Sequence, residues 1–345
     1  MAPALVENLN EDSVVSGKAT AIKPTTTVTE PTDGPVPTAV EVVITAEERA
    51  SGVMSKQNIE KAIVALNTDG VVILSNAVDE AALDHLNEPM VNQAKYLRNA
   101  PGTQFNYDKK AQNILQHMIP DPEYIHPSIH ANPFALAVCK VAMGPNPVLR
   151  YHKANTNFPG KTRQPVHSDV HYAHPRACFS LAVNIMPVDC DPFLGSTEVW
   201  LGTHTTTVFS DQDGMNGIRP EKLAERRKVV PPVQPTVKKG SIIIRDMRLW
   251  HAGMPNNSED TVRVMINLIY FADWYRCPMK IKFPPESREK IEELERISGS
   301  SIAAEYVEGL DHLTLPHTHD FGQDDKREHW GRNLETPLTK GRGLK

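Results

Sequence analysis

The sequence predicts a mainly β fold of the α+β class, built around an antiparallel sandwich or barrel. Two observations support this prediction. From about residue 147 the chain passes through short β-rich runs that are separated by Gly, Pro and Asn. No regular helical pattern alternates with these runs, and strands that follow one another without helices are typical of antiparallel sheets. Before residue 147 the pattern is helix, strand, helix, which supplies the α component.

The two ends of the chain differ in composition from the middle. Residues 1–50 are rich in Thr, Pro, Val and Glu and carry few large apolar side chains, so we expect a flexible arm. Within it, VEVVI (40–44) has the composition of an edge strand. A folded domain is expected over residues 51–310. Residues 311–345 are polar, and we expect an irregular C-terminal tail.

The folded domain is expected to open with a helix. Ser55 is a suitable N-cap, and the apolar residues after it recur at helical spacing. The apolar face is expected to consist of Ile59, Ile63, Val64 and Leu66. Asp69-Gly70 then predicts a turn, because Gly accepts the backbone angles that end a helix. VVIL (71–74) predicts a buried strand, and residues 79–93 predict a second helix.

Five β-rich runs make up the second part of the domain. They are residues 147–158, 177–188, 196–204, 240–253 and 262–274. The polar segment 212–231 lies between the third and fourth runs, and we expect an insertion there with a short helix. Residues 286–307 predict a C-terminal helix.

Composition excludes several classes of protein. The chain has 345 residues, a net charge of −5 and no long basic run, so nucleic-acid binding is not expected. No apolar window is long enough for a membrane span, and the N-terminus does not have the pattern of a secretory signal. Four scattered cysteines without C-x-x-C spacing indicate reduced thiols and a cytoplasmic location. A homodimer is left open.

The stretch QPVHSDVHYAHP (164–175) is a candidate metal site. In a strand, side chains alternate with a period of two, so His167 and Asp169 would point to the same side. His171 continues the period, so the pattern alone does not say which histidine pairs with Asp169. A short H-x-D motif is weak evidence by itself.

The second half of the site comes from a later hairpin. The run 240–253 carries His251 near its end, and the next run carries Arg263. Two imidazoles and one carboxylate are the facial triad of non-haem Fe(II) oxygenases, and a planar guanidinium suits a ligand carboxylate. Arg245 and Arg248 compete with Arg263 for that role. Arg248 lies three residues before His251, so in a regular strand it points to the opposite face.

Other histidines have ordinary interpretations. We expect His171 and His174 to be loop or rim residues, and His152 to be a half-buried histidine on a strand. His317 and His319 have H-x-H spacing, but no nearby carboxylate or return strand organises them, so surface positions are expected.

With His167, Asp169, His251 and Arg263, the sequence resembles the phytanoyl-CoA dioxygenase family of Fe(II)/2-oxoglutarate oxygenases, in its fungal natural-product type. The resemblance covers roughly residues 56–285. The stretches that carry it are NTDGVVILSNAVDEAALDHL (67–86), FPGKTRQPVHSD (158–169), GSTEVWLGTH (195–204) and KKGSIIIRDMRLWHAGMPNNS (238–258). It implies a double-stranded β-helix, or jelly roll, with supporting helices and a core at about 147–285.

The resemblance also implies roles for residues. His167, Asp169 and His251 match the iron ligands, and Arg263 matches the arginine that pairs with the C5 carboxylate of 2-oxoglutarate. Gln164 matches a glutamine that lies near the cosubstrate in fungal natural-product members. Weaker matches to cosubstrate or substrate contacts are Thr197 and, within AQNILQHM, Gln112, Asn113 or Gln116, of which we select Gln116. One departure is Gly253, where some members have a hydroxyl residue two positions after the distal histidine.

The implied activity is a dioxygenase reaction that uses Fe(II), 2-oxoglutarate and O2 and releases succinate and CO2. The expected substrate is a small molecule of secondary metabolism. Halogenating relatives lack the carboxylate ligand, so Asp169 favours hydroxylation, desaturation or a related oxidative rearrangement. The alternatives are a metal-dependent hydrolase or isomerase that uses the same triad, and a non-catalytic binding protein. Dependence of turnover on iron and 2-oxoglutarate distinguishes them.

Overall fold

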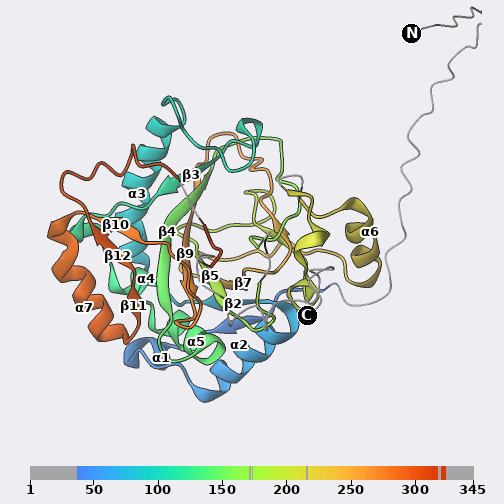
Figure 1. The fold of residues 1–345 in the computed structure, drawn as a ribbon, viewed down its shortest axis with the longest axis horizontal. Helices are drawn as coiled ribbons and strands as arrows, with labels where there is room; N and C mark the ends of the chain where they lie inside the picture. The colour runs from blue at the N-terminus through green and yellow to red at the C-terminus, as the bar shows by residue number, and fades with distance from the viewer. Residues whose placement is uncertain (1–36, 171, 173, 215–216, 318–319, 324–345) are drawn as a thin grey trace, which may run out of the picture. The chain divides into compact units, whose positions relative to one another are not determined.

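The structure is a computed structural model that describes residues 37–323 except 171, 173, 215–216 and 318–319. Most of the predicted arm and the end of the predicted tail, with His171 and His319, therefore lie outside the described residues. Within the described part, a large mixed sheet forms the centre of the domain (Figure 1). This confirms the mainly β prediction.

The main sheet has eight strands in the order β1-β2-β7-β5-β9-β4-β11, and β3 pairs with β4. Pairing among β2, β7, β5, β9, β4 and β3 is antiparallel, whereas β1 and β11 add in parallel. The strands are β1 Glu41–Val43, β2 Val71–Ser75, β3 Asn113–His117, β4 Val148–Asn157, β5 Ser180–Ile185, β7 Ile242–Asp246, β9 Arg263–Phe271 and β11 Ser301–Ile302. The sequence runs predicted as strands are thus confirmed as elements, although several are shorter.

A short second layer faces the main sheet. Strands β6 (Glu198–Val199) and β8 (His251–Ala252) form an antiparallel ribbon. Single bridges join His251 to His167 and Val199 to Val233. A large sheet opposed by such a smaller one is the double-stranded β-helix that was predicted.

The central strands are buried on both faces, with a clear period of two. On β5, Leu181, Val183 and Ile185 pack into the main hydrophobic core, while Asn184 between them lines a cavity on the opposite face. The core face is covered by α2 (Lys56–Asp69), α3 (Glu80–Leu97) and α5 (Pro133–Met143) (Figure 1). The other face carries polar side chains that line the cavity. One face of the sheet therefore packs in the hydrophobic core, and the opposite face holds the candidate site.

The N-terminal elements refine the prediction. Strand β1 pairs with β2, and α1 (Ala46–Ser51) follows it, so ordered structure begins before residue 51. Ser55 caps α2 as expected, because its hydroxyl accepts a hydrogen bond from the backbone N–H of Asn58. Val64 does not belong to the buried face, because it is 64% exposed, and the helix instead buries Ala62, Ala65 and Leu66.

Gly70 ends α2 for a steric reason. Its φ is 79°, in the left-handed region that favours glycine. A Cβ at this position would also lie 2.5 Å from Nδ1 of His204. The turn predicted from Asp69-Gly70 is therefore fixed by backbone angle and by packing.

The remaining helices are short. They are α1, α4 (Pro127–His130), α6 (Pro220–Val229) and α7 (Arg288–Ser298). The predicted C-terminal helix ends at Ser298 rather than near 307, because Gly299 adopts φ 57° and stops it. The chain then forms β11 and β12 (Ala304–Tyr306), and β12 pairs with β10 (Ile281–Phe283). None of the helices in the described part is long and apolar enough to cross a membrane.

All four cysteines are free thiols, as predicted from their spacing. Three of them, Cys139, Cys190 and Cys277, are buried. Burial raises the pKa of the Cys139 thiol to about 12, so that thiol is inert near neutral pH.

Candidate active site

His167 and His251 form a directly opposed pair. The backbone N–H of each donates to the carbonyl of the other at 2.9 Å, and their ring centroids are 4.3 Å apart. The H-x-D segment is therefore a single antiparallel bridge rather than the regular strand the sequence suggested. This bridge brings together two residues that lie far apart in the sequence.

Backbone carbonyls fix the tautomer of both imidazoles. Nδ1 of His167 lies 2.9 Å from the carbonyl of Pro165, and Nδ1 of His251 lies 2.9 Å from the carbonyl of Leu249. A carbonyl only accepts, so each Nδ1 carries the proton and each Nε2 is left with a lone pair. This is the arrangement that orients histidine for metal ligation.

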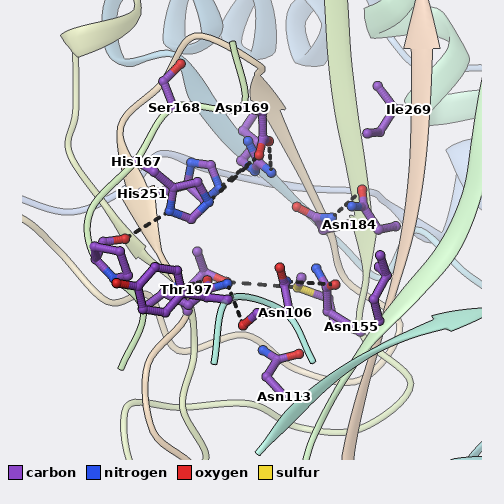
Figure 2. A pocket seen from close by; sticks show the side chains of 18 of the residues that line it. Asn106, Asn113, Asn155, His167, Ser168, Asp169, Asn184, Thr197, His251 and Ile269 are labelled. Atoms are coloured by element: carbon purple, nitrogen blue, oxygen red, sulfur yellow. Dashed lines mark hydrogen bonds and ion pairs between the residues drawn. The ribbon is translucent and has the colours of Figure 1, made fainter. Parts of the chain in front are cut away.

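Asp169 completes the cluster (Figure 2). Its Oδ1 lies 3.9 Å from Nε2 of His167 and 3.7 Å from Nε2 of His251. Its Oδ2 accepts a hydrogen bond from the guanidinium of Arg245 at 2.6 Å. Burial alone would raise the pKa of Asp169, but Arg245 and the two imidazoles hold it below its usual value. The group is therefore a carboxylate at neutral pH.

The donor set fits a divalent metal ion. Two imidazole nitrogens and a carboxylate oxygen lie within 4.8 Å of one another. Burial, and then the charge of Arg245, lower the pKa of His251 well below its usual value, so His251 is neutral and able to ligate. Two histidines and one carboxylate on one side of an ion correspond to the facial triad that favours iron(II).

The cluster opens into a cavity of about 500 Å³ that Arg263 also lines. The Arg263 side chain is 2% exposed, and one terminal nitrogen donates to the carbonyl of Gly195 at 2.9 Å. Its Nε has no hydrogen-bond partner among the described residues. Burial lowers the pKa of this guanidinium. A buried cation that lines a cavity without a carboxylate partner suits a ligand carboxylate.

The two competing arginines have other partners. Arg245 lines the same cavity, but it holds Asp169. Arg248 is bound through two nitrogens to Asp246, at 2.8 and 2.7 Å, and is not among the lining residues of the cavity in the described part. The opposite orientation expected for Arg248 is therefore what the structure has.

Gln164 and Gly253 share one space at the cavity wall. The Gln164 side-chain carbonyl accepts from the backbone N–H of Gly253 at 2.7 Å. A Cβ added at Gly253 would lie 2.5 Å from that oxygen. The Gln164 amide thus occupies the volume into which a side chain at position 253 would extend. Thr197, the other expected contact, also lines the cavity and directs its hydroxyl to the sulfur of Met265 at 3.9 Å (Figure 2).

Gln116 lies on the other face of β3. Its amide nitrogen donates to the carbonyl of Met90 at 2.9 Å, and its oxygen accepts from Thr156 at 2.8 Å. It is absent from the described cavity lining, whereas Asn113, three residues earlier, is part of it. Side chains alternate along a strand, so Gln116 and Asn113 point to opposite faces. Of the three polar candidates in AQNILQHM, Asn113 is the one that lines the cavity (Figure 2).

The close approach of the Gln164 amide to Gly253 leads to a first prediction. Gly253→Ala should push the Gln164 amide aside, because the atom it meets is the end of a flexible side chain. The apparent 2-oxoglutarate affinity of Gly253→Ala should therefore change by the same factor as that of Gln164→Ala. The double variant should match either single one, since the two changes act on one interaction. Additive losses in steady-state titrations would show that the residues act separately.

The sequence reasoning missed Gln212 and, apart from Asn113 and Gln164, the other amides that line the cavity. Gln212, in the segment taken as an insertion, binds both backbone groups of Ser168, at 2.7 and 3.3 Å, and so holds the residue between two ligand candidates. Neutral amides form the wall opposite the histidines (Figure 2). They include Gln104, Asn106, Asn113, Asn155, Asn184 and Asn267. These amides are scattered along the sequence and form no motif. They are recognised as a group only because the fold places them around one cavity.

The predicted tail also reaches the cavity. Phe321 is 8% exposed and lines it, next to Tyr151 at 5.5 Å between ring centroids. The Phe321 carbonyl accepts hydrogen bonds from Tyr172 at 2.8 Å and Tyr275 at 3.0 Å. The described residues after 310 contain no helix or strand, and within this segment Phe321 packs into the cavity wall. The expected rim residue His174 is likewise buried, with 0% exposure.

Comparison with known proteins adds a family and several similar folds. The model of the family described as phytanoyl-CoA dioxygenase (PhyH) matches residues 66–265. Among solved structures, the non-heme alpha ketoglutarate dependent epimerase SnoN from nogalamycin biosynthesis has 15% identity and a TM-score of 0.48, over 63% of this chain and 82% of that one. AviO1 from Streptomyces viridochromogenes Tue57 has 19% identity and a TM-score of 0.47, over 64% and 97%. EctD from S. alaskensis, solved with 2-oxoglutarate and 5-hydroxyectoine, has 18% identity and a TM-score of 0.46, over 65% and 78%.

Proposed function

The chain belongs to the phytanoyl-CoA dioxygenase family, whose members are Fe(II)/2-oxoglutarate-dependent enzymes, and from this membership we propose how its residues serve that chemistry. His167, Asp169 and His251 hold iron(II), and Arg263 binds the far carboxylate of 2-oxoglutarate. The observation that carries the proposal is that the triad and Arg263 line one cavity. Iron, 2-oxoglutarate and O2 together supply an oxidising centre, with succinate and CO2 as the coproducts.

The protein's own residues supply orientation and charge. Pro165 and Leu249 keep the Nε2 atoms of the two histidines turned toward the metal position. Arg245 occupies the second oxygen of Asp169 and so leaves Oδ1 for ligation. Arg263 stands at the start of β9 in the wall of the same cavity, where its guanidinium would receive the far carboxylate of the cosubstrate. Gln164 and Thr197 are proposed as neighbours of the cosubstrate.

The cavity wall indicates the substrate class. Apart from the triad, Arg245 and Arg263, the lining residues in the described part are uncharged. Amides and the aromatic residues Phe105, Tyr107, Tyr151 and Phe321 predominate. A volume of about 500 Å³ is in the range of sites for drug-sized ligands. We therefore propose a neutral, oxygen-rich small molecule of secondary metabolism, which is hydroxylated, desaturated or rearranged oxidatively.

The test is substrate-stimulated formation of succinate. The purified, iron-loaded protein is incubated with 2-oxoglutarate and fractions of a metabolite extract, and succinate and new products are measured together. Stimulation that requires iron, 2-oxoglutarate and O2 supports the proposal. Turnover that proceeds without 2-oxoglutarate would instead support the hydrolase or isomerase alternative.

A second prediction concerns Phe321 as a wall of the substrate pocket. Phe321→Ala removes a ring that lines the cavity, so the substrate loses an apolar contact while the triad and Arg263 are untouched. The expected result is a loss in kcat/KM for the substrate of at least about 10-fold, because even one methylene in an apolar pocket contributes that much, with unchanged iron content and 2-oxoglutarate affinity. Thr314→Ala, an exposed change in the same segment, serves as the control. Equal kcat/KM in Phe321→Ala and the wild type would remove Phe321 from the pocket.

A further inference from the structure

A second cavity lies at the edge of the main sheet, where β3, β4 and β10 meet residues 312–316. Its volume is about 90 Å³. Half of its described lining residues are basic, namely His117, Arg150, His152, Lys153, Lys280, Lys282 and His312, and the other half are apolar residues, prolines and Tyr151. No Asp or Glu is among its described lining residues. Tyr151 belongs to the walls of both cavities, so this one adjoins the substrate pocket.

Four buried nitrogen atoms of this lining lack hydrogen-bond partners in the described part of the chain. They are Nε2 of His117, Nε of Arg150, Nε2 of His152 and Nζ of Lys153. Buried polar groups in native proteins are nearly always paired. Nζ of Lys153 and Nε of Arg150 always carry hydrogen, so these two atoms indicate a missing acceptor, whereas the two Nε2 atoms belong to neutral imidazoles that can themselves accept.

Lys153 is the clearest of the four. Its side chain is 5% exposed, and it lies directly opposite His117 in the β3–β4 register. Burial lowers the pKa of Lys153 to about 8. Burial, and then Lys153, His317 and His312, lower the pKa of His117 to about 3. Asp121 and Asp311 act on His312, but neither lines the cavity. The histidines are therefore neutral, and the positive charge of the lining comes from its Lys and Arg side chains. The Lys153 ammonium lies 5.0 Å from the centroid of the Tyr151 ring, and no carboxylate is among the described lining residues.

We propose that this second cavity binds a small oxyanion, either a phosphate or a carboxylate, that accepts hydrogen bonds from Lys153 and Arg150. Its size supports a small ligand, because a water occupies about 30 Å³ of liquid, and only a few water volumes fit. The exposed Lys280 and Lys282 at the same cavity favour the approach of an anion. The site is separate from the iron and cosubstrate positions and does not depend on the proposed function.

The experiment is calorimetric titration of the purified full-length chain with inorganic phosphate and, separately, with acetate. Saturable binding of either anion is expected, and the tighter one identifies the ligand chemistry. Lys153→Met should weaken binding by about 10- to 150-fold, the effect of losing a hydrogen bond to a charged group. Lys282→Gln, at an exposed position that should not affect folding, should weaken it by about two- to fivefold.

Two controls locate the anion. Lys56→Met removes one exposed charge on α2 and should leave the affinity unchanged. Arg263→Leu should also retain binding, because Arg263 belongs to the other cavity. The proposal is overturned if neither anion binds, if both Lys153→Met and Lys282→Gln bind as tightly as the wild type, or if Arg263→Leu abolishes binding. Where Lys153→Met does not fold, the Lys282→Gln titration decides.

Discussion

Replacing His167, Asp169 or His251 with Ala should abolish substrate-dependent turnover and remove most of the bound iron. Each change takes one of three donor atoms from a site whose members lie within 4.8 Å of one another. The loss should exceed the roughly 10- to 100-fold cost that outer-shell changes have on metal affinity. Arg245→Met removes only the ion-pair partner of Asp169 and no metal ligand, so its iron affinity should fall by an amount within that range.

The measurements are iron stoichiometry, turnover and the thermal unfolding midpoint of each variant. The unfolding midpoints of metal-free His167→Ala and His251→Ala should stay close to the wild-type value, because these side chains face a cavity rather than the apolar core. Asp169→Ala should unfold at a lower temperature, because it leaves the buried Arg245 without its carboxylate partner. His85→Ala, at an exposed histidine that stacks on Tyr124, controls for the loss of an imidazole. A triad variant that binds iron normally and turns over at the wild-type rate would exclude that residue from the site.

Arg263→Leu should weaken 2-oxoglutarate binding while iron binding barely changes. Removing one partner of a buried charge pair costs roughly 2–5 kcal/mol, which corresponds to about 30-fold to several thousand-fold in affinity. Arg263 is 2% exposed and its Nε lacks a partner in the described structure. In Arg263→Leu, water would therefore not readily take over the hydrogen bonds that the guanidinium donates to the cosubstrate carboxylate. Arg263→Lys should recover only part of the affinity, because a point charge does not reproduce the planar fork.

The readout for Arg263 is the apparent 2-oxoglutarate affinity, with iron content as the control. Arg245→Met provides the contrast, since it should lose iron and cosubstrate together. Unchanged affinity in Arg263→Leu would place the carboxylate contact on Arg245, whose second terminal nitrogen is also buried without a partner among the described residues. Loss of iron together with cosubstrate in Arg263→Leu would make Arg263 structural.

The elements of the fold were largely readable from local pattern. Apolar runs without intervening helices predicted the strands, and Ser55 and Gly70 marked the two ends of α2. The errors arose where burial depends on a distant partner. Val64 has helical spacing but faces solvent, and Phe321 lies in a polar stretch but is buried against Tyr151 and Phe271. Local spacing does not specify which side of an element a distant segment will cover.

Some residues of the candidate site could be identified from the sequence, and others only from the structure. His167, Asp169, His251 and Arg263 were identified by residue type and by a family resemblance, because an iron ligand set has a recognisable chemistry. The choice of Gln116 was not supported, since strand period alone does not say which face looks into the cavity, and the structure turns Asn113 inward instead. Gln212 gave no signal, because its role exists only through contact with Ser168.

By itself, the sequence determined the metal ligand candidates of this protein, because these depend on which donor groups are present, and its resemblance to a known family indicated the reaction class. Only the tertiary structure decided which arginine remains available, which amides line the pocket, and that Lys153 and its neighbours surround a second cavity. The physical reason is that desolvation and pairing are properties of the space around a side chain. Segments distant in sequence create that space, so residue order alone does not reveal it.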